Sequence, residues 1–269
     1  MTQRALVFDC DGVLADTEKD GHRVAFNQAF EEFNLPLNWS PSDYGPLLEI
    51  GGGKERIRAD LSPQLLAAAG RGDSPDEVGE LVIALHRRKT ELYRQMVNAG
   101  QLPGRSGVAR LAIEALRAGW RIAVASTSAQ ESVRAVAEHV FPPAVIEVLQ
   151  IFAGDIVARK KPAPDIYLTA ARELGVEVEN CVAVEDSPIG CASAVAAGMT
   201  TVVTESQYTA GEPFEGAALV VSELGDPLGS PAMVRANPAE LSISGVVTLA
   251  DLEQLLQNHQ QIEGSETTR

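Results

Sequence analysis

Two aspartates, Asp9 and Asp11, directly follow the apolar run 5–8 near the start of the chain, in the pattern Asp-x-Asp-Gly. Carboxylates this close together at the end of a buried strand repel each other and raise at least one pKa, unless a cation neutralises them. A structural role rarely needs such a pair, whereas a magnesium site with a carboxylate nucleophile does. A calcium loop or a plain turn is the alternative. The strand before the pair, and the lack of a twelve-residue ligand loop with a closing Glu, argue against calcium.

The composition limits the classes of partner. The chain has 269 residues, of which 45% are hydrophobic, and a formal net charge of −15. Nucleic-acid phosphates would be repelled by such a chain, so we expect no nucleic-acid partner. An anionic substrate would have to be met by a local group of cations or by a bound metal.

The three cysteines, Cys10, Cys181 and Cys191, form no spaced framework, which favours a reducing compartment. Strand alternation turns Cys10 away from the two aspartates and into the core. We expect no membrane partner, because no apolar stretch is long enough to span a bilayer. The first strand starts near residue 4, which leaves no room for a targeting peptide. The sequence therefore predicts a cytoplasmic protein, and we expect a monomer.

Short apolar runs alternate with helical patterns beyond residue 102. Strands are predicted at 5–8, 121–125, 149–153, 181–184 and 200–203, with 218–221 a candidate for one more. Helices are predicted at about 106–118, 130–140, 165–174 and 188–197. This alternation predicts an α/β fold with a Rossmann-like parallel sheet and helices on both faces. Ligand sites in such sheets lie outside the carboxyl ends of the strands.

The stretch that follows the first strand differs from the rest. Its periodic apolar positions predict an all-helical cap domain over 17–102, inserted into an α/β core domain made of 1–16 and 103–269. An insert at this point would form a lid over the site. The segment 223–247 is rich in Pro, Gly and Ser and predicts an irregular excursion. A closing helix is expected at 248–257, and a disordered polar tail after Gln260.

Three more clusters follow predicted strands. The hydroxyl run Ser126-Thr127-Ser128 precedes a helix, where it would bind a phosphate or simply cap the helix. Lys161 lies in a proline-stiffened loop and could reach a phosphoryl oxygen, or be one of two surface lysines with Lys160. Asp165 could cap the helix after this loop.

The third cluster is Glu185-Asp186-Ser187-Pro188. Ser187 and Pro188 fit the cap and the first position of a helix. The two acids beside a buried strand end are harder to explain in that way. Together with Asp9 they would supply hard oxygen ligands for Mg²⁺.

Several polar residues of the insert are candidates for substrate contact. Glu18 and His22 share a helical stripe with apolar residues, so they need partners or a cleft. Lys89 lies on the apolar stripe of another predicted helix, from which its ammonium could snorkel outward or reach the substrate.

The glycine run Gly51-Gly52-Gly53 is followed by two cations, Lys54 and Arg56. Main-chain N–H groups of glycines can approach an anion, and the cations can neutralise it. A flexible hinge with solvated charges is the alternative. In so acidic a chain, we interpret this loop as the grip for a second phosphate, which favours a bisphosphate substrate.

The four clusters in this order resemble the signature of the haloacid dehalogenase superfamily of phosphatases: Asp9-x-Asp11-Gly, then Ser126, then Lys161-Pro-x-Pro, then Glu185-Asp186. The likeness covers nearly the whole chain. The helical insert is similar to that superfamily's small helical cap, and the stretches 16–27, 47–56 and 89–91 resemble the CbbY group, whose members remove xylulose 1,5-bisphosphate, an inhibitor of Rubisco.

The resemblance implies a phosphatase that uses Mg²⁺ and a small sugar phosphate. It implies Asp9 as the nucleophile and Asp11 as the acid and base, with Ser126, the Thr127 N–H and Lys161 holding the phosphoryl oxygens. Mg²⁺ would be held by Asp9, the Asp11 carbonyl and Asp186, with Glu185 ordering a metal-bound water. A β-phosphoglucomutase-like mutase remains an alternative, since its first step is identical, and a non-catalytic sugar-phosphate sensor is a second one.

Overall fold

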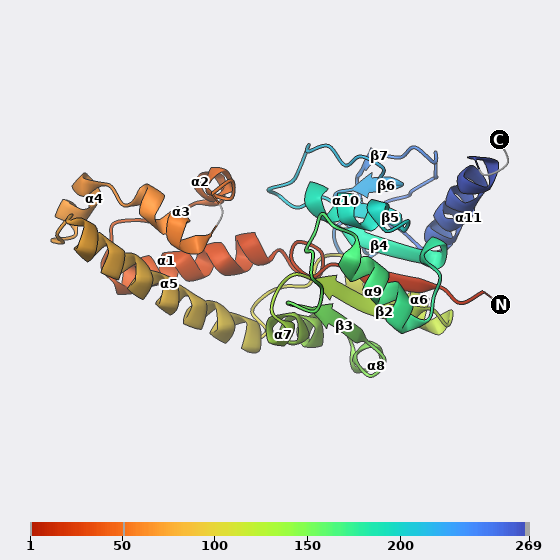
Figure 1. Ribbon diagram of the computed structural model, residues 1–269, viewed down its shortest axis with the longest axis horizontal. Helices are drawn as coiled ribbons and strands as arrows, with labels where there is room; N and C mark the ends of the chain where they lie inside the picture. The colour runs from red at the N-terminus through yellow and green to blue at the C-terminus, as the bar shows by residue number, and fades with distance from the viewer. Residues whose placement is uncertain (1, 51, 267–269) are drawn as a thin grey trace. The chain divides into compact units, whose positions relative to one another are not determined.

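The computed structural model describes residues 2–50 and 52–266. Their contacts divide the chain into two compact units. The α/β unit comprises Met1–Asp16 and Pro103–Arg269, and the helical unit comprises Thr17–Leu102. Figure 1 shows the strands gathered in the first unit and a purely helical second unit.

The α/β unit is built on one sheet, which has seven strands in the described part of the chain, in the order β3-β2-β1-β4-β5-β6-β7. All neighbouring strands are parallel except β6 and β7, which are antiparallel. The strands are β1 (Ala5–Phe8), β2 (Arg121–Ser126), β3 (Gln150–Ala153), β4 (Cys181–Glu185), β5 (Thr200–Thr204), β6 (Leu219–Val221) and β7 (Val234–Ala236). The predicted Rossmann-like fold class is confirmed.

Helices cover both faces of this sheet. They are α6 (Val108–Arg117), α7 (Gln130–Val140), α8 (Pro143–Ile146), α9 (Asp165–Leu174), the short 3-10 helix η2 (Val178–Asn180), α10 (Pro188–Ala196) and α11 (Leu249–Glu266). Helix α9 packs on β1, β2 and β3, and α10 packs on β4 and β5 (Figure 1). Helices α6 and α11 pack on each other, α6 on β2 and α11 on β4 and β5.

Strands β1, β4, β5 and β6 are buried along their whole length, which explains why β1 and β6, and β4 before its last residue, are continuous apolar runs rather than alternating ones. Ala5 and Val7 of β1 join a cluster with Ile166 and Tyr167 of α9. The residue after Val7, Phe8, lies against Phe141, with ring centroids 5.6 Å apart. The side chains of β1 therefore divide between the two cores by strand alternation.

The helical unit has five α-helices among its described residues: α1 (Arg23–Glu32), α2 (Pro41–Leu47), α3 (Gly53–Asp60), α4 (Pro63–Ala68) and α5 (Pro75–Asn98). Capping boxes start α2, at Ser40 and Asp43, and α5, at Ser74 and Glu77. The first turn, η1 (Thr17–His22), is a π-helix rather than the expected α-helix. Such turns are rare and occur frequently at functional sites.

Aromatic side chains form the core of the helical unit. Trp39 packs edge-on against Phe30, with ring centroids 4.7 Å apart, and lies 5.6 Å from the ring of Tyr44. Its indole N–H donates to Asp60 at 2.5 Å. This hydrogen bond satisfies the one polar group of a fully buried indole.

Two expectations for the end of the chain hold only in part. The segment 223–247 is irregular as expected except for β7, where Val234 and Ala236 pair with β6 and Arg235 forms an ion pair of 2.5 Å with Glu205. The closing helix runs to Glu266 rather than ending near 257, so the expected disordered tail is helical over 261–266. Gln260 donates to the Glu179 carbonyl and the Asn180 side chain, a tertiary contact that the local pattern does not reveal.

Helices long and apolar enough to cross a lipid bilayer are not found in the described part of the chain.

We predict that Phe30→Ala destabilises the helical unit by about 3–5 kcal/mol, because it leaves a cavity against Trp39. The measurement is urea unfolding followed by Trp39 fluorescence in a Trp120→Phe background, so that one indole reports on this unit. Ile83→Ala is the matched control, since Ile83 of α5 is 58% exposed, and its effect should stay within about 0.5 kcal/mol. Equal losses in both variants would show that the aromatic cluster is not the core.

Candidate active site

The predicted acidic residues meet where the strand order reverses. Asp9 directly follows β1, Glu185 is the last residue of β4, and Asp186 is the next residue. The Asp9 N–H donates to the Val184 carbonyl at 2.8 Å, which extends the pairing of β1 with β4 by one bond. This reversal point is where parallel α/β sheets leave room for a ligand.

Lys161 joins the acids from a separate loop. Its ammonium lies 2.6 Å from the Asp9 carboxylate and 2.6 Å from that of Glu185. It also donates to the Ala125 carbonyl at 3.0 Å and to the Tyr167 hydroxyl at 3.2 Å. Only 8% of the Lys161 side chain is exposed, so the alternative of a surface lysine is wrong for this residue.

Burial and crowding shift the pKa values of these groups. The pKa of Asp9 is raised to about 7 as the net result of several effects. Burial is the largest and raises it, the positive charge of Lys161 lowers it, and the charges of Glu185 and Asp11 raise it. Burial also raises the pKa of Asp186 well above its usual value, assisted by Glu185 and Asp9. For Lys161, burial lowers the pKa, but the neighbouring carboxylates of Asp9 and Glu185 raise it well above its usual value.

The donor set fits a divalent cation. Oxygens of Asp9, Glu185 and Asp186 all lie within 4.8 Å of one another. Three carboxylates at this separation repel each other and favour a bound cation, and hard oxygen ligands suit Mg²⁺ among others. Glu185 is the most constrained of the three. Its Oε1 accepts from Lys161 and Tyr167, and its Oε2 accepts from the Asp186 N–H.

Two glycines leave the space that these carboxylates occupy. A Cβ on Gly12 would lie 1.9 Å from Oδ2 of Asp186, and a Cβ on Gly190 would lie 2.0 Å from Oε2 of Glu185. Gly12 also has a φ of +78°, in the left-handed region that favours glycine. The turn after Asp11 and the start of α10 are therefore specified by the acids beside them.

One residue of the hydroxyl run, Ser128, contacts the acidic site. Ser126 is buried at the end of β2 and accepts the Ser128 N–H at 3.1 Å, while Thr127 is exposed. Ser128 donates to the Asp11 carboxylate at 2.5 Å. The residue at the N-cap of α7 is Ala129, without a side-chain cap, so the capping alternative is wrong.

The remaining residues of the lysine loop are structural. Lys160 is exposed and pairs with Asp155 at 2.8 Å. The expectation that Asp165 caps the following helix is wrong: Pro164 is the N-cap of α9, and the Asp165 carboxylate pairs with Arg159 at 2.7 Å. Ser187 does cap α10, accepting the Gly190 N–H at 3.1 Å.

In the helical unit, Glu18 and Arg56 both bind the hydroxyl group of Tyr44. The Tyr44 hydroxyl donates to Glu18 at 2.7 Å and accepts from Arg56 at 3.1 Å. Arg56 lies 3.7 Å from the Glu18 carboxylate and also donates to the Ile50 carbonyl. Burial and the Glu18 charge raise the pKa of Tyr44, so its hydroxyl keeps its proton.

His22 and Lys89 form a second polar group in the same unit. The Lys89 ammonium lies 3.0 Å from Nδ1 of His22 and 4.5 Å from the centroid of the Phe26 ring. Lys89 is buried, so it does not snorkel outward. The pKa of Lys89 is lowered to about 8, chiefly by burial; the charge of Glu18 raises it and that of Arg56 lowers it. Burial, Lys89 and Arg56 together lower the pKa of His22 well below its usual value.

The glycine loop starts α3. Gly52 is its N-cap with a φ of +99°, and a Cβ on Gly53 would lie 2.9 Å from the ring of His86. Lys54 is exposed, in contrast to Arg56. The first glycine of the run, Gly51, lies outside the described residues.

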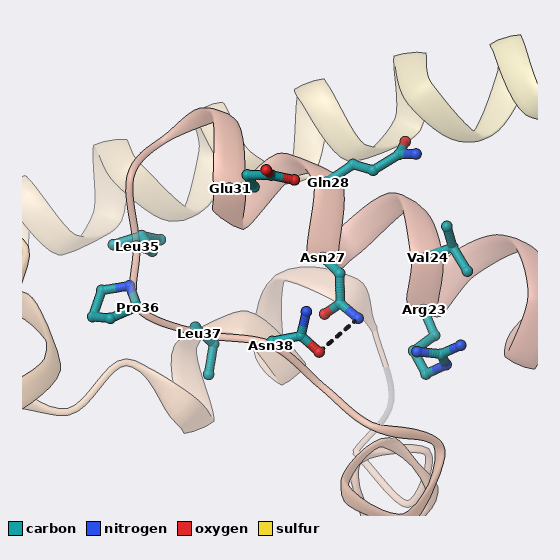
Figure 2. A pocket seen from close by; sticks show the side chains of 9 residues that line it. All are labelled: Arg23, Val24, Asn27, Gln28, Glu31, Leu35, Pro36, Leu37 and Asn38. Carbon is teal, nitrogen blue, oxygen red and sulfur yellow. Dashed lines mark hydrogen bonds between the residues drawn. The ribbon is translucent and has the colours of Figure 1, made fainter.

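A separate open pocket of about 700 Å³ lies between α1 and the segment that follows it (Figure 2). None of the predicted site residues lines it. Its polar side chains bind each other and the main chain: Asn27 donates to Asn38 at 3.4 Å, and both Asn27 and Arg23 donate to the Trp39 carbonyl.

Sequence reasoning missed three hydroxyl groups that form hydrogen bonds with side chains of predicted site residues. Tyr167 binds Lys161 and Glu185, Tyr44 binds Glu18 and Arg56, and Ser128 binds Asp11. Ser128 lies within the hydroxyl run, whose pattern does not single it out. A tyrosine on the core face of a predicted helix, which must find a hydrogen-bond partner when buried, was a usable signal for Tyr167.

Known proteins resemble the chain at the level of sequence. The model of the haloacid dehalogenase-like hydrolases matches residues 3–198. A CBBY-like protein from Arabidopsis thaliana is 48% identical over 223 residues, covering 83% of this chain and 70% of its own. Protein CbbY of Cupriavidus necator is 42% identical, covering 83% and 87%.

A solved structure extends the likeness to the fold. A mutant of CbbY from Rhodobacter sphaeroides, in complex with xylulose 1,5-bisphosphate, is 38% identical with a TM-score of 0.61, and the match covers 82% of this chain and 95% of that one. The match of the family model to residues 3–198, together with relatives above 40% identity, establishes that this chain belongs to the haloacid dehalogenase-like hydrolases, as a phosphatase similar to CbbY.

Proposed function

We propose that this phosphatase is Mg²⁺-dependent and converts xylulose 1,5-bisphosphate to xylulose 5-phosphate through an aspartyl-phosphate. The observation that carries the proposal is the Asp9 carboxylate, held 2.6 Å from Lys161 beside Glu185 and Asp186. The bisphosphate bound by the related CbbY supports the choice of substrate. The cytoplasm remains the proposed compartment, supported by three free and buried cysteines, and a monomer remains the proposed state.

Asp9, the Asp11 carbonyl and Asp186 would hold Mg²⁺, with Glu185 behind them. When bound, the ion would offset the charge between an anionic nucleophile and an anionic phosphate. Lys161 would contribute in the same direction from its position against Asp9. The raised pKa values of Asp9 and Asp186 support a site that needs additional positive charge.

The residues of the α/β unit suit a two-step displacement. The Asp9 carboxylate would attack phosphorus, and the leaving sugar oxygen would take a proton from Asp11. Ser126, the Thr127 N–H and Lys161 would hold the phosphoryl oxygens as charge spreads over them. Asp11 would then take a proton from the water that hydrolyses the aspartyl-phosphate. The 2.5 Å hydrogen bond from Ser128 supports this assignment, because it fixes the Asp11 carboxyl group.

The helical unit would bind the second phosphate. Arg56 and Lys89 are cations with little exposed surface, and Arg56 presents a guanidinium, which binds phosphate through two parallel hydrogen bonds. Gly52, Gly53 and Lys54 would add main-chain N–H groups and one exposed charge. Glu18 and His22 would bind sugar hydroxyls. Burying cations is unfavourable unless anions compensate them, and in a chain with a net charge of −15 a dianionic phosphate group of the substrate would do so.

We predict that Asp9→Asn abolishes phosphate release, because an amide is a very poor nucleophile and also weakens the metal site. Inorganic phosphate is measured with Mg²⁺ and xylulose 1,5-bisphosphate, alongside circular dichroism to confirm that the variant is folded. Wild-type enzyme that yields an isomerised sugar phosphate without free phosphate would indicate a mutase. Turnover retained in the folded variant would contradict Asp9 as the nucleophile.

We predict that Arg56→Ala lowers kcat/KM for the bisphosphate by about 30-fold or more, from the loss of a charge-assisted contact worth about 2 kcal/mol or more. Hydrolysis of p-nitrophenyl phosphate, which has no second phosphate, should change less than threefold. Arg58→Ala is the matched control, because Arg58 is an exposed arginine on the same helix. The loss of kcat/KM for the bisphosphate in Lys54→Ala should lie between the losses in Arg56→Ala and Arg58→Ala. Equal losses on both substrates in Arg56→Ala would refute the second-phosphate role.

We predict that kcat/KM for the bisphosphate falls as the pH rises through about 8, the pKa to which burial lowers Lys89. The ammonium is present below this pH and lost above it, while Arg56 stays charged and the neighbouring His22 is already neutral. A pH profile from 7 to 9.5 should show a drop on the order of tenfold. Lys89→Met should remove the drop, and p-nitrophenyl phosphate should not show it. A wild-type profile that is flat through pH 8 would contradict this role of Lys89.

A further inference from the structure

Arg105 of the α/β unit is a buried cation that none of the steps above uses. Its guanidinium donates to main-chain carbonyls of four residues: Gly12, Thr204 at 2.9 Å, Glu205 at 2.8 Å and Ser222 at 2.6 Å. A guanidinium has five N–H groups in a fixed plane and can satisfy such a set, whereas an ammonium has three. The arrangement is therefore specific to arginine.

The four carbonyls belong to three different strand ends. Gly12 lies in the turn after β1, Thr204 ends β5 and precedes Glu205, and Ser222 follows β6. The Arg105 N–H in addition donates to the Leu14 carbonyl at 2.9 Å. One side chain thus connects the turn that carries the Asp-x-Asp-Gly motif to the ends of β5 and β6, which lie beyond β4 in the sheet.

The contact with Gly12 reaches two groups of the site. The Gly12 N–H donates to the Ala15 carbonyl at 2.9 Å and the Gly12 carbonyl accepts from Arg105, so the residue that follows Asp11 is held through both of its main-chain polar groups. The Asp186 carboxylate occupies the space where a side chain on Gly12 would be.

We propose that Arg105 is a positioning residue that acts through Gly12: it fixes the backbone that carries Asp11 and the space in which Asp186 binds the metal. This inference rests on the proposed function, in which Asp11 is the acid and Asp186 a metal ligand. A residue with this role affects the protonation of the leaving group and the affinity for Mg²⁺. A residue that only stabilises the conformation of loops affects neither.

Arg110 offers a matched control. It lies on α6, and its guanidinium donates to the carbonyls of Gly225 at 3.0 Å and Val247 at 2.7 Å, besides pairing with Glu114. It is thus a second arginine with little exposed surface that binds loop carbonyls, but its partners belong to neither the Asp9 turn nor the Glu185–Asp186 segment.

The experiment compares Arg105→Lys, Arg105→Gln and Arg110→Lys with the wild-type enzyme. Mg²⁺ binding to the substrate-free protein is measured by calorimetry, and kcat/KM is measured for a sugar phosphate and for p-nitrophenyl phosphate. Protonation matters for an alkoxide leaving group and little for nitrophenolate, and a general acid contributes about 10²–10⁴-fold. In the Arg105 variants we expect Mg²⁺ affinity to fall at least fivefold and sugar phosphate turnover to fall at least tenfold more than aryl phosphate turnover. Arg110→Lys should lower thermal stability alone.

Equal losses on both substrates with unchanged Mg²⁺ affinity in the Arg105 variants would overturn the proposal. So would the failure of both Arg105 variants to fold while Arg110→Lys folds, because Arg105 would then be a folding residue. The proposed function fails separately, when wild-type enzyme releases no phosphate or Asp9→Asn retains activity. In that event the Mg²⁺ affinities of the Arg105 and Arg110 variants still decide whether Arg105 positions the acidic cluster.

Discussion

Oxygens of three carboxylates, those of Asp9, Glu185 and Asp186, lie within 4.8 Å of one another at the carboxyl edge of β1 and β4. Such crowding in a buried place is unfavourable unless positive charge compensates it. Lys161 supplies part of that charge through two contacts of 2.6 Å. Removing one partner from a buried pair of this kind typically costs about 3–5 kcal/mol. The remaining excess of negative charge is what makes the site suitable for a divalent cation and an aspartyl nucleophile.

The sheet produces this crowding by its topology. Strand order reverses between β1 and β4, and at such a reversal the segments that follow the neighbouring strands diverge and ligands bind outside the strand ends. The side chains around this point suit the carboxylates that meet there. Gly12 and Gly190 leave room for carboxylates, and Tyr167 bridges Lys161 and Glu185 with its hydroxyl. Fold and site are therefore specified by the same few positions.

Much of the sheet could be predicted from the sequence, because buried parallel strands leave short apolar runs and the polar residues after them mark their carboxyl ends. The grouping of Asp9, Lys161 and Glu185 follows from this rule. Other features depend on contacts between distant segments and leave no local signal. The four carbonyls bound by Arg105 come from residues 12 to 222, and β7 exists only through its pairing with β6.

The helical unit shows the same limit. The burial of Lys89 could be predicted from its place on an apolar stripe, but its approach to His22 could not, because the π-helical turn at 17–22 changes the spacing of an α-helix. Tyr44 lies in a short helix of polar and proline residues, where periodicity carries little information. Its link between Glu18 and Arg56 emerges only from packing against Trp39 and Phe26.

The central claim is that the carboxylate of Asp9, among several neighbouring acids, is the group that accepts phosphorus. A crystal structure of the protein with Mg²⁺ and beryllium trifluoride, which mimics a phosphoryl group bound to a carboxylate, tests it most directly. The account predicts beryllium bonded to an oxygen of Asp9, with fluorides toward Lys161 and Ser126. Beryllium bonded to Asp11 or Asp186, or found elsewhere in the protein, would contradict this claim.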